Sequence, residues 1–277
     1  MMKIFVLASG RSGTKFLSGL FKNNIINCTS KHEPFPNMFG MPIYWYQNRE
    51  IEKIRKRFLI KKNRMDRCKK NLYVETNHAF LKSFSDIAME YYPDMKLIHL
   101  IRNPLKIARS ELNRESWVND VPLRILFLTY RYYRASDGKK YFRWSLTWNE
   151  DIFKELKLDS PTPYQMYVVQ WVEIENRAIN FLDKYRKKDD CYTISAPKEL
   201  NDPKIVKDMY NFFGLKTKRD DILIKGKQNK IRIPTVVSDK DKEEFQKVIN
   251  ALPDKYLKIF QKEPYTRFEW TDSLKKK

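Results

Sequence analysis

The segment that most constrains the fold is the N-terminal run of residues 3–21, KIFVLASGRSGTKFLSGLF. Residues 3–8 form a short apolar run that predicts a buried strand. A loop of Gly, Ser, Thr and one Arg follows, and residues 14–22 then place Phe and Leu side chains on one helical face. A strand that enters a helix through such a small-residue loop is typical of α/β proteins with a parallel sheet.

The alternation of strands and helices continues along the chain. Further strands are predicted at 71–76, 96–102 and 191–196, and helices at 49–64, 83–92, 104–113, 165–186 and 203–213, with a last helix beginning at Ser238. Pro93 and Gly214 each end a helix, and Pro104 begins one. The expected fold class is therefore α/β, with a central parallel β-sheet flanked by helices.

Residues 114–165 differ from the rest in their composition and periodicity. They carry Trp117, Trp144 and Trp148 with many tyrosines and two turn signals, but show no clear helical or strand period. We interpret this stretch as an aromatic-rich insertion that caps the α/β core. Since no repeat or linker divides the sequence, residues 1–277 are predicted to form a single domain.

The charge balance and the cysteines bound the class of protein. The chain has 55 Lys and Arg against 34 Asp and Glu, a net charge of +21, which indicates either an anionic partner or only a solvated basic surface, as in residues 52–64. Cys28, Cys68 and Cys191 are too far apart for a CxxC pair, so no metal site is predicted and a reducing compartment is expected. The N-terminal apolar run is too short for a signal peptide and no segment is long enough to span a membrane, so we expect a cytoplasmic location.

The loop after the first strand has the composition of a phosphate-binding loop. Its glycines, hydroxyls and cations, together with the following helix N-terminus, are the groups that hold an anion. The common nucleotide loop G-x-x-x-x-G-K-[ST] does not fit, because Ala8 stands five residues before Gly13 and Phe16 follows Lys15 where a hydroxyl is required. The loop therefore predicts a phosphate site of another kind.

Two segments resemble the sulfotransferase family that uses 3′-phosphoadenosine 5′-phosphosulfate (PAPS). GRSGTKFL, at 10–17, resembles the loop of that family that binds the 5′-phosphosulfate. LIHLIRNPLKIARS, at 97–110, is similar to its 3′-phosphate site, with Arg102 at a strand end and Ser110 eight residues later. A guanidinium and a hydroxyl at this spacing can hold one phosphate from two sides.

The resemblance implies a P-loop NTPase-like sulfotransferase fold and transfer of a sulfuryl group from PAPS. The acceptor would be a hydroxyl or amine of a small molecule or saccharide, the product would be adenosine 3′,5′-bisphosphate, and the cap at 114–165 would lie on the acceptor side. The chain departs from the family's sequence pattern at two places, and contacts that the family makes there are not expected in full. SAPKE follows the strand at 191–196 where the family often has an acidic element, and 224–232 lacks the tryptophan of the family's closing segment.

The resemblance also implies which residues contact the nucleotide. These are Arg11, Ser12, Gly13, Thr14, Lys15, Phe16, Arg102 and Ser110. Arg11 is in addition the expected cation on the transferring group. Lys15 replaces the usual Thr and either adds a second charge or points into solvent. Phe16 either lines the adenine site or belongs to the packed face of its helix.

Three residues are candidates for the base that takes the acceptor proton. Glu33 is the first choice, since protein-tyrosine and glycan sulfotransferases place a glutamate near this position. His78 and Glu75 lie in 73–80, the region where the small-molecule branch places its histidine. A histidine titrates near neutrality, whereas a glutamate needs a raised pKa or a nearby cation. His32 and His99 are predicted to be structural.

Two other functions compete with this interpretation. One is a nucleotide or nucleoside kinase with a degenerate phosphate loop. The other is a non-catalytic polyanion-binding protein, which the net charge and the aromatic insertion favour. Nucleic acid is not the expected partner, and the sequence leaves the oligomeric state open.

Overall fold

The computed structural model describes residues 1–120, 131–224 and 235–276. The chain divides into two compact units. The first unit contains Met1–Arg102 and Asn180–Lys230, and the second contains Asn103–Ile179 and Ile231–Lys277. Among the described helices, each is too short or too polar to cross a membrane.

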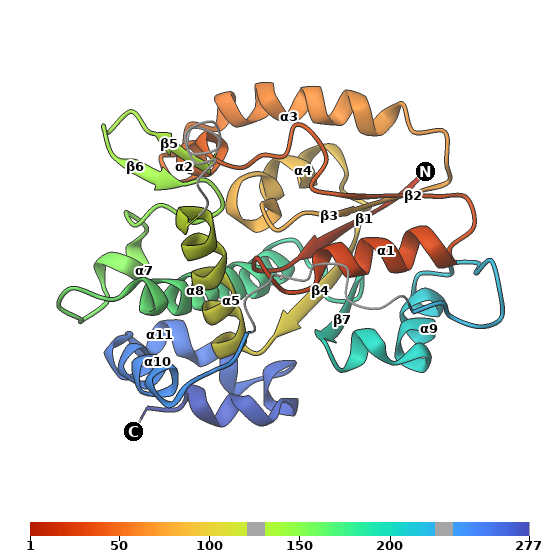
Figure 1. The fold of residues 1–277 in the computed structure, drawn as a ribbon. Helices are drawn as coiled ribbons and strands as arrows, with labels where there is room; N and C mark the ends of the chain where they lie inside the picture. The colour runs from red at the N-terminus through yellow and green to blue at the C-terminus, as the bar shows by residue number, and fades with distance from the viewer. Residues whose placement is uncertain (121–130, 225–234, 277) are drawn as a thin grey trace. The chain divides into compact units, whose positions relative to one another are not determined.

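The first unit is built on a five-stranded sheet in the order β2-β3-β1-β4-β7 (Figure 1). Its strands are β1 (Met2–Leu7), β2 (Cys28–His32), β3 (Leu72–Thr76), β4 (Lys96–Arg102) and β7 (Cys191–Ala196). Every neighbouring pair is parallel. The α/β class with a central parallel sheet is confirmed.

Helices of the first unit pack on both faces of this sheet. They are α1 (Thr14–Asn24), α2 (Met41–Gln47), α3 (Ile51–Asp66), the π-helix η1 (Phe80–Phe84), α4 (Ser85–Tyr91), the 3-10 helix η2 (Glu199–Asn201) and α9 (Pro203–Phe212). On one face, Ile4 and Val6 of β1 join a core with α1 and α9. On the other, Phe5 stacks on Phe80 with ring centroids 5.2 Å apart.

The second unit is mainly helical. It contains α5 (Pro104–Asp120), β5 (Tyr132–Arg134), β6 (Lys140–Phe142), α7 (Asp151–Lys154), most of α8 (Pro163–Lys184), α10 (Asp239–Ala251), α11 (Asp254–Leu257) and three 3-10 helices, η3 (Lys258–Gln261), η4 (Tyr265–Arg267) and η5 (Glu269–Leu274). Trp171 is fully buried and stacks on Phe260 at 5.1 Å. Ser238 and Asp241 form a capping box at the start of α10.

The predicted insertion at 114–165 differs from expectation at its start. The helix predicted at 104–113 continues to Asp120, and residues 114–120 contain no Pro or Gly that would end it. Farther on, the strands β5 and β6 pair antiparallel and carry aromatic contacts. The ring centroid of Phe142 lies 5.3 Å from that of Tyr132 and 5.2 Å from that of Trp144. The cap role and the single domain stay predictions. Residues 121–130 of this stretch, and residues 225–232 of the segment at 224–232, lie outside the described residues.

Among the elements that were not predicted from the sequence, three belong to the first unit and lie near the predicted site residues. β2 is an edge strand with the polar sequence CTSKH, which has no apolar alternation to identify it. α2 carries Pro42 in its first turn and follows Gly40, so its composition suggests a turn. The helix predicted at 83–92 overlaps the π-helix η1, which includes Ser83 and Phe84, and α-helical hydrogen bonding begins with α4.

Candidate active site

The sheet gathers most of the predicted site residues at one edge. Its strands are parallel, so their carboxyl ends open on the same side. The order of the strands reverses at β1, because the chain passes from β3 on one side of β1 to β4 on the other. Ligands of such sheets bind at this carboxyl edge, next to the reversal. The glycine loop follows β1, Glu33 follows β2, His78 follows β3 and Arg102 ends β4.

The loop between β1 and α1 is held in shape by its own serines. The Ser12 hydroxyl donates to the Ser9 carbonyl at 2.8 Å, and the two hydroxyl oxygens are 2.9 Å apart. Gly13 has φ of +105°, and a Cβ atom there would meet Leu200 at 3.4 Å and Ala196 at 3.6 Å. These are ordinary contact distances, so it is the positive φ that favours glycine here. The loop leads into the N-terminus of α1, whose first turn contains no acidic residue.

Arg102 lies against this loop. Its Nη1 donates to the carbonyl of Arg11 at 2.5 Å, while its buried Nε has no hydrogen-bond partner among the described residues. Burial lowers the pKa of Arg102, because a charged guanidinium is disfavoured away from water. An unpartnered buried donor is costly, so this atom is suited to an anionic ligand.

Ser110, the proposed partner of Arg102, is buried on α5 in the second unit. Asn103 begins this unit, and its side chain caps α5 by accepting from the backbone N–H of Leu105 at 3.0 Å. Arg102 belongs to the first unit and Ser110 to the second. Binding of one phosphate by both residues therefore stays a prediction.

The remaining loop candidates differ in exposure. Thr14 is buried at the start of α1, whereas Lys15 is exposed. Phe16 is partly buried and packs against the core formed by β1, α1 and α9, which favours a packing role.

Glu33 lies between two histidine rings. Its Oε1 is 3.4 Å from Nε2 of His78 and 3.6 Å from Nε2 of His32. The other ring nitrogen of His32 lies 2.9 Å from the carbonyl of Thr76, which orients that ring. The Glu33 side chain is 25% exposed and that of His78 only 2%. Glu33 is thus more accessible to solvent than His78, which is buried.

Glu75, the third candidate base, is fully buried. Its carboxylate accepts from Lys61 at 2.8 Å and from Tyr73 and Asn77 at 3.0 Å. Lys61, itself 1% exposed, also donates to the carbonyl of Pro34 at 3.2 Å. Three donors and complete burial favour a structural role for Glu75, in which the pair fixes the loop that follows Glu33.

Sequence reasoning missed Lys61 and assigned His32 no part in the site. Lys61 lies in the run 52–64, which has the composition of a solvated face. A signal was nevertheless present, since Ile54, Phe58, Lys61 and Met65 follow a helical period and are the buried residues of α3. A lysine on the apolar stripe of a helix indicates a buried carboxylate partner.

Comparisons with known proteins gave matches only among solved structures. No family profile matches the chain, and no curated protein matches it. A sulfotransferase from Alicyclobacillus acidocaldarius is similar over 89% of this chain and 90% of its own, with 16% identity and a TM-score of 0.47. A sulfotransferase domain from the curacin biosynthetic pathway is similar over 98% of this chain and 95% of its own, with 13% identity and a TM-score of 0.44. These values assign no activity and no residue role to this chain.

Proposed function

We propose that this chain is a sulfotransferase that uses PAPS as its co-substrate. The observation that carries the proposal is the partly buried Arg102, whose buried Nε has no partner among the described residues, beside a glycine loop that leads into the N-terminus of α1. Two anion-binding features thus lie at the carboxyl edge of one parallel sheet, as a ligand with two separate phosphate groups requires. The motif resemblance supplies the identity of that ligand.

Each residue then has a defined part. The backbone of Ser12, Gly13 and Thr14 would hold the 5′-phosphosulfate, with Arg11 as the cation on it, and Arg102 would hold the 3′-phosphate with Ser110. PAPS supplies a sulfuryl group that is activated by its phosphate leaving group. These residues bind and orient that group, and metal ligation is not part of the proposal.

We assign the proton transfer to Glu33. The acceptor O–H or N–H bond breaks as the bond to sulfur forms, the sulfur–phosphate oxygen bond breaks, and the proton passes to the Glu33 carboxylate. The Nε2 atoms of His78 and His32 lie within 3.6 Å of the Glu33 carboxylate and are placed to orient it toward the acceptor.

Nucleotide binding tests the first part of the proposal. Desalted protein is titrated with adenosine 3′,5′-bisphosphate in a calorimeter, and Arg102→Ala is expected to abolish the heat of binding. Arg219→Ala is the matched control, because Arg219 is exposed and its substitution removes one positive charge from the same unit. A preference for ATP with magnesium would instead support a kinase.

Transfer assays test the second part. Glu33→Gln and His78→Ala should both keep nucleotide binding, and Glu33→Gln should lose nearly all transfer because it removes the proton acceptor. Equal, mild losses in both variants would contradict the assignment of the base.

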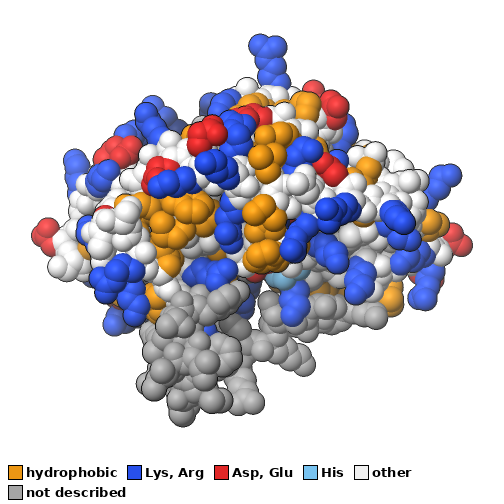
Figure 2. Space-filling view, turned by 90° about the horizontal axis from the view of Figure 1, so that it is seen from above, with side chains coloured by type: hydrophobic (Ala, Val, Ile, Leu, Met, Phe, Trp, Pro, Cys, Tyr) orange, Lys and Arg blue, Asp and Glu red, His pale blue; other side chains and the backbone are white. Residues whose placement is uncertain are grey.

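A non-catalytic polyanion-binding protein is the competing function. Figure 2 shows Lys and Arg side chains distributed over the face that it displays, in line with the net charge of +21. This alternative is supported if neither nucleotide raises the thermal stability while heparin binds tightly and in a salt-sensitive way.

A further inference from the structure

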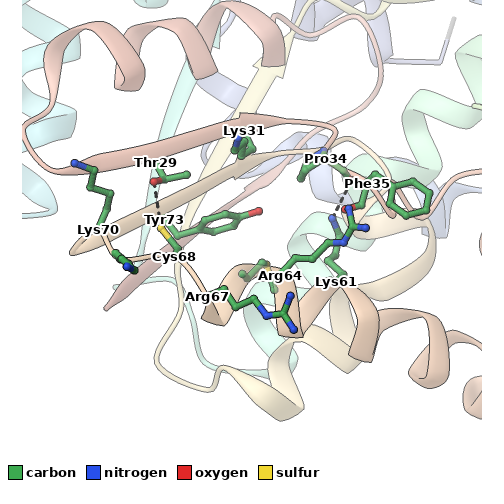
Figure 3. A pocket seen from close by; sticks show the side chains of 12 residues that line it. Thr29, Lys31, Pro34, Phe35, Lys61, Arg64, Arg67, Cys68, Lys70 and Tyr73 are labelled. Atoms are coloured by element: carbon green, nitrogen blue, oxygen red, sulfur yellow. Dashed lines mark hydrogen bonds between the residues drawn. The ribbon is translucent and has the colours of Figure 1, made fainter.

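A basic pocket of about 630 Å³ lies in the first unit, between β2 and β3 on one side and the end of α3 on the other (Figure 3). Six of the residues that line it are cationic, and none is acidic: Lys31, Lys61, Arg64, Arg67, Lys69 and Lys70. It is separate from the glycine loop after β1, none of whose residues lines it.

The alternation of the sheet builds one wall of this pocket. Thr29 pairs in register with Tyr73, and Lys31 with Glu75, so these four side chains lie on one face of the sheet. Glu75 bonds to Lys61 of α3, which shows that this is the face covered by α3. Lys31 and Tyr73 consequently face the arginines at the end of that helix.

Most of the positive charge in the pocket is not neutralised. Lys61 is already paired with Glu75. The other five cations form no ion pair with any acidic residue that the structure describes. Asp66, which lies between them in sequence, is bound instead to Lys62 at 2.7 Å and to Tyr92 at 2.9 Å. Like charges gathered around one cavity repel each other, and a multiply charged anion would relieve this repulsion.

An aromatic ring lies at the rim of the pocket. Phe35 is 62% exposed, and the guanidinium of Arg64 lies 4.8 Å from its ring centroid. Arg64 also approaches the Phe35 carbonyl at 3.4 Å, so ring and cation are held together. An exposed ring beside charge-assisted donors suits a ligand with both an apolar ring face and anionic substituents.

The pocket is connected to Glu33. Pro34 and Phe35, which line the pocket, directly follow Glu33 in the chain. Lys61 lines it as well and holds the carbonyl of Pro34. A molecule in the pocket therefore contacts the same loop that carries the assigned base.

We propose that this pocket binds the anionic part of the acceptor, and that the acceptor is an acidic saccharide with two or more carboxylate, sulfate or phosphate groups. The term acceptor rests on the proposed function, whereas the anion site stands on the pocket alone. Arg64 and Arg67 supply the bidentate contacts, Lys31, Lys69 and Lys70 supply further charge, and Phe35 contacts a sugar ring.

Binding of a trisulfated heparin disaccharide to the nucleotide-free protein tests the pocket. The double variant Arg64→Gln/Arg67→Gln is compared with Lys204→Gln/Lys207→Gln, which removes two exposed charges at the same spacing from α9. We expect the first variant to weaken binding by at least about tenfold for each lost contact, and the second to change it by less than about twofold. Lactose, an uncharged disaccharide, should not bind.

The proposal is overturned if the wild type does not bind the disaccharide. It is also overturned if both double variants lose the same affinity, or if lactose binds as well as the disaccharide. Circular dichroism and thermal unfolding confirm that both variants are folded. If Arg64→Gln/Arg67→Gln abolishes binding of adenosine 3′,5′-bisphosphate, the pocket is a nucleotide site and the proposal is also overturned.

A second arm separates this proposal from the proposed function. Arg102→Ala should lose the nucleotide and keep the disaccharide. Protein that binds the disaccharide but no nucleotide refutes the sulfotransferase while supporting the anion site. Protein that binds the nucleotide but not the disaccharide supports the sulfotransferase and refutes the acidic acceptor.

Discussion

Removal of the Glu75 carboxylate is expected to destabilise the first unit strongly. Glu75→Ala takes away the acceptor shared by Lys61, Tyr73 and Asn77, whose side chains are all buried. Lys61 then keeps only the carbonyl of Pro34 as a hydrogen-bond partner among those that the structure records for it. The perturbation therefore leaves a buried, uncompensated ammonium group.

The magnitude follows from this loss. Breaking a buried ion pair from one side costs about 3–5 kcal/mol, since the remaining charge has lost both its partner and its hydration. Lys61→Met should cost a similar amount, because Glu75 then remains buried with only two neutral donors. The double variant Lys61→Met/Glu75→Ala buries no charge, so it should be less destabilised than either single variant.

Urea unfolding followed by circular dichroism measures the four members of this cycle. Arg55 and Glu90, an exposed pair between α3 and α4, serve as the control, because removal of one partner there should change the stability far less than removal of Glu75 does. Our reasoning is refuted if Glu75→Ala costs less than about 1 kcal/mol, or if the double variant costs the sum of the two single ones.

Three further predictions follow from other parts of the structure. Gly13→Ala should lower the free energy of unfolding by about 1–3 kcal/mol, because its φ of +105° strains any other residue, and nucleotide titration should show weaker binding. Burial acts to raise the pKa of Asp241, but hydrogen bonds, chiefly from Arg109, outweigh it and lower that pKa. The stabilisation is present above the unfolded pKa and is lost as the pH falls through the folded one, so the cost of Arg109→Ala in urea unfolding should shrink from about pH 6 to about pH 2. Burial raises the pKa of Cys28 and Cys191 to about 12, so mass spectrometry should find both unmodified after brief treatment of the native protein with iodoacetamide, and alkylated after unfolding.

The sequence predicted those elements in which buried apolar residues recur at the regular spacing of a strand or a helix. β1, β4 and α1 have apolar runs or stripes, and all three lie close to the predicted residues. β2 was missed because an edge strand is half-covered and needs no apolar alternation. The π-helix η1 was missed because its hydrogen-bonding pattern leaves no compositional signal that differs from an α-helix.

The candidate site was predictable where a strand end and a loop are adjacent in sequence. The loop at 9–13 and Arg102 were identified in this way. The position of Glu33 between His32 and His78 was not predictable, because it depends on β2 and β3 lying side by side in register. The Lys61–Glu75 pair likewise depends on a helix and a strand meeting across the sheet face.

The division of the chain has a consequence for the order in which the protein is made. The first unit is discontinuous, since Asn103–Ile179 of the second unit is synthesised before β7. Until β7 emerges from the ribosome, the buried strand β4 has no neighbour on one side, an interval of roughly 5–20 s at about 5–20 residues per second. Ribosome-bound chains that end before Cys191 should therefore be protease-sensitive and should recruit chaperones, whereas chains that extend well beyond α9 should resist digestion.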